Sequence, residues 1–136
     1  MQARSSALGE SLGAASVMLR VRDLHRSILW FEKALGLKPF ASGVDGKHPY
    51  AAFSLGGTGV ALWQLQPEEP DPETNLSSTY IVFAVPSGID ELRQEILSTG
   101  TNAGEMRESK VARFFWFYDP DGHRFEVSQY IAPPAA

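Results

Sequence analysis

Residues 16–36, SVMLRVRDLHRSILWFEKALG, decide the fold, because a strand pattern in them leads directly into a helix pattern. From Val17 to Val21 an aliphatic residue occurs at every second position, as in a strand with one buried face. Apolar residues then recur every three or four positions, which predicts a helix with one apolar side. Asp23 stands where a helix N-cap would stand, and Gly36 where a helix would end. This stretch predicts one strand followed by one helix.

Residues 80–100, YIVFAVPSGIDELRQEILSTG, repeat this pattern. The strand end at Val85 and the helix end at Gly100 both lie 64 positions after their counterparts in the first stretch. Ser87 and Asp90 resemble a capping box at the start of the second helix. Two unrelated strand–helix units of similar length are the alternative, but the equal offset favours a duplicated module.

Three strand-like segments separated by turns follow each predicted helix. They are residues 37–42, 49–55 and 59–66 in the first half and 102–107, 112–118 and 123–130 in the second. Each half is too small to bury its helix alone, so the halves are expected to share one sheet system. The sequence therefore predicts an α+β fold made of two βαβββ modules. The expected boundaries are a disordered leader at 1–14, a first module at 15–66, a linker at 67–76, a second module at 77–131 and a tail at 132–136.

The composition limits the partners. The chain has 136 residues, a net charge of −4 and no run of Lys or Arg, which argues against nucleic acid. It has no cysteine, which excludes disulfides and thiolate metal sites. No apolar run approaches the roughly 20 residues that span a bilayer, so no membrane partner is expected. A cytoplasmic location is the default expectation.

Two motifs resemble a known family. VRDLHRS at 21–27, with the aromatic pair at 30–31 and ALG at 34–36, is similar to the opening module of vicinal oxygen chelate proteins. These include glyoxalases, bleomycin-resistance proteins and extradiol dioxygenases. FYDPDGHRFE at 117–126 resembles their closing hairpin, above all in the fosfomycin-resistance and glyoxalase I branches. The resemblance covers residues 15–130. It implies a cupped, eight-stranded mixed sheet and a homodimer in which a second chain completes the exposed sheet edges.

The resemblance also implies four positions for metal ligands, near the start of the first strand and on the last strand of each half. Glu126 alone offers a good ligand for a divalent cation. The other positions fall on Ser16, Tyr80 and, depending on the hairpin turn, Leu62, Trp63 or Gln64. Because these side chains are poor ligands, no metal site and no cofactor are expected. A divalent metal held by Glu126 is the alternative.

Glu126 is the candidate catalytic residue, as a metal ligand or a general base. The alternative is a carboxylate that is only paired with an arginine, for which Arg20, Arg113 and Arg124 are available. The ligand-binding candidates are Ser16, Met18, Arg20, His48, Leu62, Trp63, Gln64, Tyr80, Arg113, Trp116 and Ser128. On the first-half hairpin, either Leu62 and Gln64 or Ala61 and Trp63 face the cup, and His48 enters it only if its loop folds inward.

These residues favour two classes of function. The first is a protein that binds a small aromatic or apolar molecule in its concave sheet without a standard metal site. The second is an enzyme of the same superfamily, such as a lyase, an isomerase, a glutathione or thiol transferase, or a dioxygenase, that uses Glu126. A module that binds no ligand would need a cup filled by its own side chains.

Overall fold

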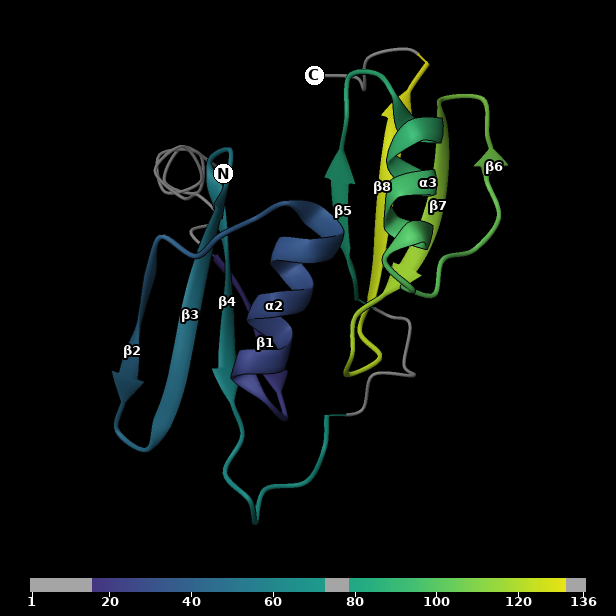
Figure 1. Ribbon diagram of the computed structural model, residues 1–136. Helices are drawn as coiled ribbons and strands as arrows, with labels where there is room; N and C mark the ends of the chain where they lie inside the picture. The colour runs from purple at the N-terminus through teal and green to yellow at the C-terminus, as the bar shows by residue number, and fades with distance from the viewer. Residues whose placement is uncertain (1–15, 73–78, 132–136) are drawn as a thin grey trace, which may run out of the picture.

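The computed structural model describes residues 16–72 and 79–131 (Figure 1). The predicted leader and tail and part of the predicted linker lie outside these residues. The described elements, in chain order, are β1 (Ser16–Val21), α2 (Leu24–Leu35), β2 (Ala41–Asp45), β3 (His48–Leu55), β4 (Thr58–Gln64), β5 (Ile81–Ala84), α3 (Ile89–Ser98), β6 (Arg107–Glu108), β7 (Ala112–Tyr118) and β8 (Arg124–Tyr130). This order confirms the prediction of βαβββ twice.

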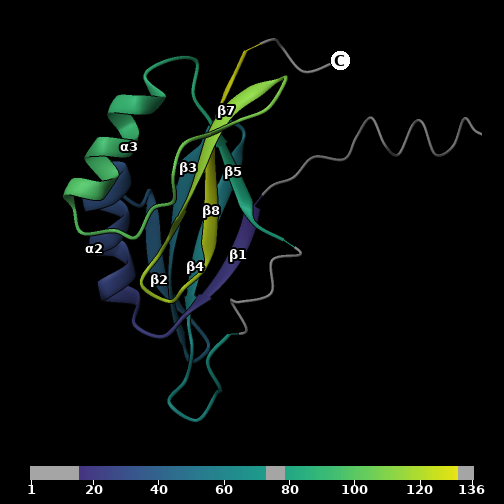
Figure 2. The same ribbon diagram turned by 90° about the vertical axis from the view of Figure 1, so that its right-hand side faces the viewer.

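The strands form two four-stranded sheets, in the orders β1-β4-β3-β2 and β5-β8-β7-β6. In each sheet the first strand of the module runs parallel to the last, and the other pairs are antiparallel. Both sheets are therefore mixed, as predicted, and they form two separate hydrogen-bonded units. The two helices lie on the same side of the sheets (Figure 2).

Aromatic side chains from both modules form the core. Phe31 of α2 is fully buried and stacks on Phe53 of β3, with ring centroids 4.7 Å apart. It also meets Phe125 of β8 edge-on at 6.2 Å. Its neighbour Trp30 stacks on Phe125 and on Phe117 of β7, at 5.9 and 6.0 Å. The helix of the first module thus packs against both sheets, and the modules share one core.

A buried carboxylate also joins the modules. Asp121, in the turn between β7 and β8, accepts hydrogen bonds from the Arg22 backbone N–H at 3.0 Å and the Arg26 guanidinium at 3.2 Å. The Ser27 hydroxyl lies at 3.5 Å from its other oxygen. The side chain of Asp121 is only 6% exposed. The second module therefore docks on the first turn of α2.

The helix ends agree with the sequence except at the start of α3, and Gly100 follows the end of α3 with a left-handed φ of 83°. Asp23 caps α2 by accepting a hydrogen bond from the Arg26 backbone N–H, and Gly36 ends α2 with a left-handed φ of 67°. The capping box predicted for α3 is wrong, because its N-cap is Gly88, which makes no side-chain cap hydrogen bond. Instead, the Ile89 backbone N–H donates to the side chain of Gln129 on β8 at 3.1 Å.

Candidate functional site

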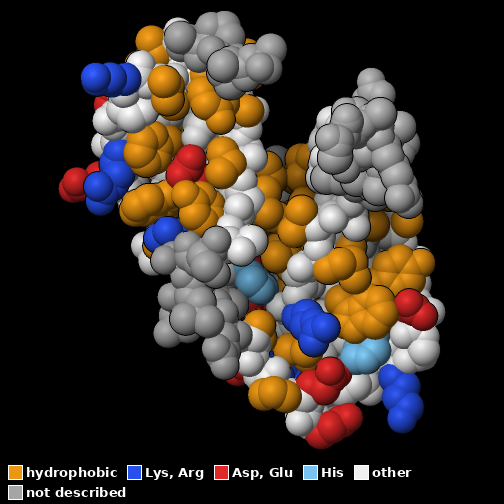
Figure 3. All heavy atoms as spheres, turned by 180° about the vertical axis from the view of Figure 1, so that it is seen from behind, with side chains coloured by type: hydrophobic (Ala, Val, Ile, Leu, Met, Phe, Trp, Pro, Cys, Tyr) orange, Lys and Arg blue, Asp and Glu red, His pale blue; other side chains and the backbone are white. Residues whose placement is uncertain are grey.

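Each sheet has a face opposite the helices, which we call the open face. On β8, Phe125 and Val127 are buried in the core, so the alternation of a strand puts Arg124, Glu126 and Ser128 on the open face. Figure 3 shows this side of the molecule, where hydrophobic side chains gather over both sheets and the surface is hollowed between them.

Hydrogen bonds on the open face hold Glu126 in place. Its Oε1 accepts from the indole N–H of Trp116, the residue paired with it on β7, at 2.8 Å. Its Oε2 accepts from the hydroxyl of Ser128 at 2.7 Å. Among the described residues, no arginine lies within ion-pairing distance of Glu126, so the alternative of a carboxylate paired with an arginine is not found. The carboxylate is half-buried and oriented by two neutral donors.

Two arginines lie against Trp116, one from each neighbouring strand. The guanidinium carbon of Arg124 on β8 lies 4.3 Å from the Trp116 ring centroid and 5.0 Å from that of Tyr80. The guanidinium of Arg107 on β6 lies 5.0 Å from the Trp116 ring. The Nε atom of Arg124 is buried without a hydrogen-bond partner among the described residues. This cluster of Arg107, Tyr80, Trp116 and Arg124 is called the Trp116 cluster below.

The first sheet puts Trp63 on its open face. Leu62 is fully buried in the core, so its neighbours Ala61 and Trp63 point the other way. The amide oxygen of Gln64 accepts from the Leu24 backbone N–H at 2.8 Å, at the start of α2. The structure thus corrects two expected ligand contacts: Leu62 packs in the core, and Gln64 points toward the helix.

His48 lies beside Trp63, with the ring centroids 4.9 Å apart. Its Nδ1 is 2.8 Å from the Gln64 carbonyl oxygen and 3.7 Å from a carboxylate oxygen of Glu69. The imidazole therefore lies at the start of β3, against the end of β4 and the segment that follows it. It is 23% exposed and accessible beside the open face of the first sheet.

The first strands carry the remaining open-face candidates. Ser16, Met18 and Arg20 are exposed on β1, where they alternate with the more buried residues of that strand. Next to β5, Tyr80 is 37% exposed. These four predicted residues thus lie on the open faces of the two sheets.

Arg113 was predicted to contact the ligand, but its side chain does not lie on the open face, and this prediction is wrong. Its guanidinium donates two hydrogen bonds to Asp90, at 2.7 and 3.0 Å, at the start of α3. This pairing lowers the pKa of Asp90 and raises the pKa of Arg113. The side chain is directed to the helix side because it alternates with the open-face residues Phe114 and Trp116 along β7.

The residues around Glu126 do not fit a divalent cation. Both oxygens of Glu126 accept hydrogen bonds, Tyr80 lies against Arg124, and Ser16 offers only a hydroxyl. A positive guanidinium near the carboxylate also opposes a second positive charge. Within the described residues, no other His, Asp or Glu joins Glu126 in a group that could share an ion.

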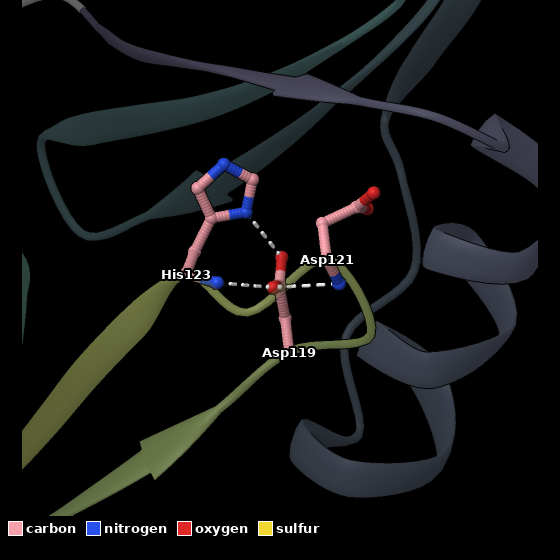
Figure 4. A group of neighbouring side chains, drawn as sticks. All are labelled: Asp119, Asp121 and His123. Carbon is pink, nitrogen blue, oxygen red and sulfur yellow. Dashed lines mark hydrogen bonds and ion pairs between the residues drawn. The ribbon is translucent and has the colours of Figure 1, made fainter. Parts of the chain in front are cut away.

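One such group lies elsewhere, in the β7–β8 turn. Asp119, Asp121 and His123 bring one ligand atom each within 4.8 Å of one another. Figure 4 shows that Asp119 already contacts the other two residues. It accepts from their backbone N–H groups, and its second oxygen is 2.8 Å from Nδ1 of His123. Because Asp121 is also engaged with α2, this group stabilises the turn and the module junction.

A cavity of about 590 Å³ lies between the two modules. Its lining is mainly apolar and comes from both halves, with Val17, Leu55 and Val60 from the first and Ile81, Phe83 and Leu92 from the second. Neither Glu126 nor the Trp116 cluster lines it. We place the candidate site at Glu126 because hydrogen-bonded polar side chains gather there, whereas Thr58 is the one polar side chain among the described residues that line the cavity.

Sequence reasoning did not propose Arg107 or Arg124 as ligand-binding residues. The expected strand at 102–107 is shorter in the structure, where β6 has two residues and pairs Arg107 with Phe114. Alternation along β8 put Arg124 on the same face as Glu126, but Arg124 was considered only as a partner of Glu126. Its contact with Trp116 joins two strands, and a local pattern does not reveal it.

The comparisons with known proteins agree with this architecture. The metallothiol transferase FosB of Lysinibacillus sphaericus (strain C3-41) is 26% identical over 113 residues, which cover 81% of this chain and 77% of that protein. The glutathione transferase FosA of Serratia marcescens is 28% identical over 110 residues, covering 80% of this chain and 74% of that protein.

Solved structures share the fold. A glyoxylase/bleomycin resistance protein/dioxygenase domain from Frankia sp. EAN1pec has a TM-score of 0.77 at 23% identity, covering 88% of this chain and 98% of that domain. TnmS3, an antibiotic binding protein from Streptomyces sp. CB03234, has a TM-score of 0.72 at 15% identity, covering 88% of this chain and 96% of that protein.

Neither of the two described helices has the length and apolar character needed to cross a membrane. The family model described as Glyoxalase/Bleomycin resistance protein/Dioxygenase superfamily matches residues 13–127, which is most of the chain. The paired βαβββ modules, the closing β7–β8 hairpin and this match agree, and the chain belongs to the glyoxalase/bleomycin resistance protein/dioxygenase superfamily.

Proposed function

We propose that this protein binds a small planar or apolar organic molecule at the open face around Glu126, without a resident metal ion. The observation that supports this proposal is the state of the Glu126 carboxylate. Its two oxygens are held by Trp116 and Ser128, and the neighbouring ligand positions carry a serine and a tyrosine instead of imidazoles. An oriented acceptor beside aromatic side chains is the usual composition of a small-molecule site.

Aromatic surface on the open face supplies the apolar contacts. On the second sheet, the ring centroids of Phe114 and Trp116 lie 6.3 Å apart. Trp63 lies on the open face of the first sheet. Burying such rings against a ligand contributes favourable free energy in proportion to the apolar area removed from water. TnmS3 is an antibiotic binding protein with this fold, but its likeness supports the proposal at the level of architecture only.

An enzyme is the second candidate, and the curated relatives favour it. FosB and FosA are both thiol-type transferases by name, and FosB is a metallothiol transferase. In that function Glu126 would be the metal ligand or the general base. In either role the hydrogen bonds from Trp116 and Ser128 would orient the carboxylate, which keeps acceptor sites beyond the two that they use.

Metal analysis and a matched binding assay separate the two candidates. The chain is purified without chelators, and its metal content is measured. Binding of 2-naphthoate and 2-naphthamide is then followed by calorimetry, with and without EDTA. We expect saturable binding of at least one compound, no effect of EDTA, and a loss of less than about tenfold for Glu126→Gln, which keeps the shape and one acceptor oxygen. Glu95→Gln, on the exposed side of α3, is the control.

Other outcomes contradict the binding proposal and support the enzyme. Stoichiometric metal in the purified protein is one, and loss of binding in EDTA is another. A third is consumption of fosfomycin with a thiol that Glu126→Gln reduces by orders of magnitude. Failure of both naphthalene compounds to bind the unmodified chain also contradicts the proposal.

We also propose a homodimer. The open-face residues of the edge strands β1 and β5 include exposed hydrophobic side chains, with Met18 at 54% and Val82 at 43%. Edge strands with apolar side chains are commonly covered by a second chain. Light scattering at several protein concentrations measures the mass, and a monomer at all of them contradicts this proposal.

A further inference from the structure

The ring of Trp116 lies against two arginine side chains. Arg124 and Arg107 approach the ring from the two strands that flank β7, and Arg124 also contacts Tyr80. A ligand that reaches the second sheet therefore meets the edges of guanidinium groups as well as aromatic carbon. This arrangement suits a ligand with a negative group more than a purely apolar one.

The charges of the Trp116 cluster are not balanced by the described residues. No ion pair within the described part of the chain involves Arg107 or Arg124. Glu126 is the acidic side chain that shares this face, and its oxygens accept from Trp116 and Ser128 instead. Two cations thus share this face with one carboxylate, and neither cation is ion-paired with it.

Arg124 is also held in place. Its Nε is buried without an acceptor, and cation–π contact with two rings stabilises the guanidinium where it lies. Because Nε is enclosed and the residue as a whole is half-buried, an incoming anion would meet the terminal nitrogen atoms of this guanidinium. A fixed planar guanidinium also loses little conformational freedom when it binds a carboxylate.

We propose that the ligand of the open face carries a carboxylate or a similar anionic oxygen group that Arg124 binds, with the charge of Arg107 beside it. This inference rests on the proposed binding function and adds the chemical class of the ligand. The anion accepts hydrogen bonds from the guanidinium of Arg124, and the planar part of the ligand lies along the neighbouring aromatic side chains. Charge-assisted hydrogen bonds of this kind are stronger than neutral ones.

The test compares 2-naphthoate with 2-naphthamide, which have the same rings and differ in charge. Binding to the full chain is measured by calorimetry at low and high salt. We expect the unmodified protein to bind the naphthoate about tenfold or more tightly than the naphthamide, as one charge-assisted hydrogen bond predicts. The preference should weaken as salt rises, because screening weakens the attraction between accessible charges.

Variants assign the preference to one residue. Arg124→Met keeps the aliphatic stem and should remove the preference, because naphthoate binding should fall by a larger factor than naphthamide binding. Arg107→Met should reduce naphthoate binding by a smaller factor. Arg113→Met removes a charge of the same sign on the helix side and should leave the preference unchanged. Arg124→Lys keeps the charge without the planar guanidinium and should retain part of the preference for naphthoate. It replaces Arg124→Met in this test if Arg124→Met does not fold.

The outcomes distinguish this inference from the function on which it rests. Equal binding of the two compounds, or a full preference in Arg124→Met, refutes the anionic ligand and leaves small-molecule binding in place. Loss of the preference in Arg113→Met as well refutes the assignment to Arg124. Failure of the unmodified chain to bind either compound contradicts both proposals.

Discussion

Replacing Asp121 with alanine tests how strongly the two modules are joined. The change removes the acceptor of the Arg22 backbone N–H, which is 3.0 Å away in a partly buried position. Leaving such a donor without a partner costs about 1–3 kcal/mol. The contact with Arg26 adds little, since that side chain is 48% exposed and an exposed pair contributes less than about 1 kcal/mol. We therefore expect a loss of about 2–3 kcal/mol in the free energy of unfolding.

Urea unfolding measures this loss. With a slope of about 1–3 kcal/mol per molar urea, the midpoint should fall by about 1 M or more. Asp121→Asn keeps one acceptor oxygen and should lose less. Asp45→Ala, on the exposed strand β2, is the control and should change the stability by less than about 0.5 kcal/mol. A midpoint for Asp121→Ala equal to that of the control would refute the reasoning, and two separate transitions in the parent protein would refute the shared core.

Three further predictions concern single side chains. Phe31→Ala should lower the free energy of unfolding by about 3–5 kcal/mol, measured by urea unfolding, because the ring is fully buried between the modules. Gly36→Ala should lower the free energy of unfolding by about 1–2 kcal/mol in the same assay, because the φ of Gly36 is 67°. Gly57→Ala is the control and should cost less, because the φ of Gly57 is not positive and an added Cβ there meets no atom within 4 Å. Asp90→Asn should be less stable than the parent at neutral pH. Because Arg113 lowers the pKa of Asp90 in the folded chain, this advantage is present above the ordinary carboxyl pKa of about 4 and is lost as the pH falls through the lower folded value. The two proteins should therefore converge in unfolding midpoint at the acid end, and a constant difference would contradict the pairing.

The sequence predicted the fold well where periodicity and end signals agreed. The strand at Ser16–Val21 and the cap at Asp23 are found as expected, because short-range hydrogen bonds and alternation determine them. The start of α3 was predicted incorrectly. Its first backbone N–H is satisfied by Gln129, which lies 40 positions later in the chain, and a local pattern cannot reveal such a partner.

The site was predicted in part, for the same physical reason. Glu126 and Trp116 were found on one face because alternation along a strand determines the facing of side chains. The hairpin carrying Trp63 stayed ambiguous, because a shift of one residue exchanges the two faces of a strand. Arg113 was placed wrongly, since its partner Asp90 lies in the other part of the module and only the folded structure brings them together.

The position of α2 has a consequence for the order in which the protein folds during synthesis. Trp30 and Phe31 leave the ribosome early, but Trp30 packs against Phe117 and both pack against Phe125, which are made some 90 residues later. Until then the aromatic side of the helix has only the first sheet to cover it, and contacts so distant in sequence form slowly. The first half of the nascent chain thus exposes an apolar surface until the second half is made. A chaperone or a neighbouring nascent chain would bind this protein at that stage.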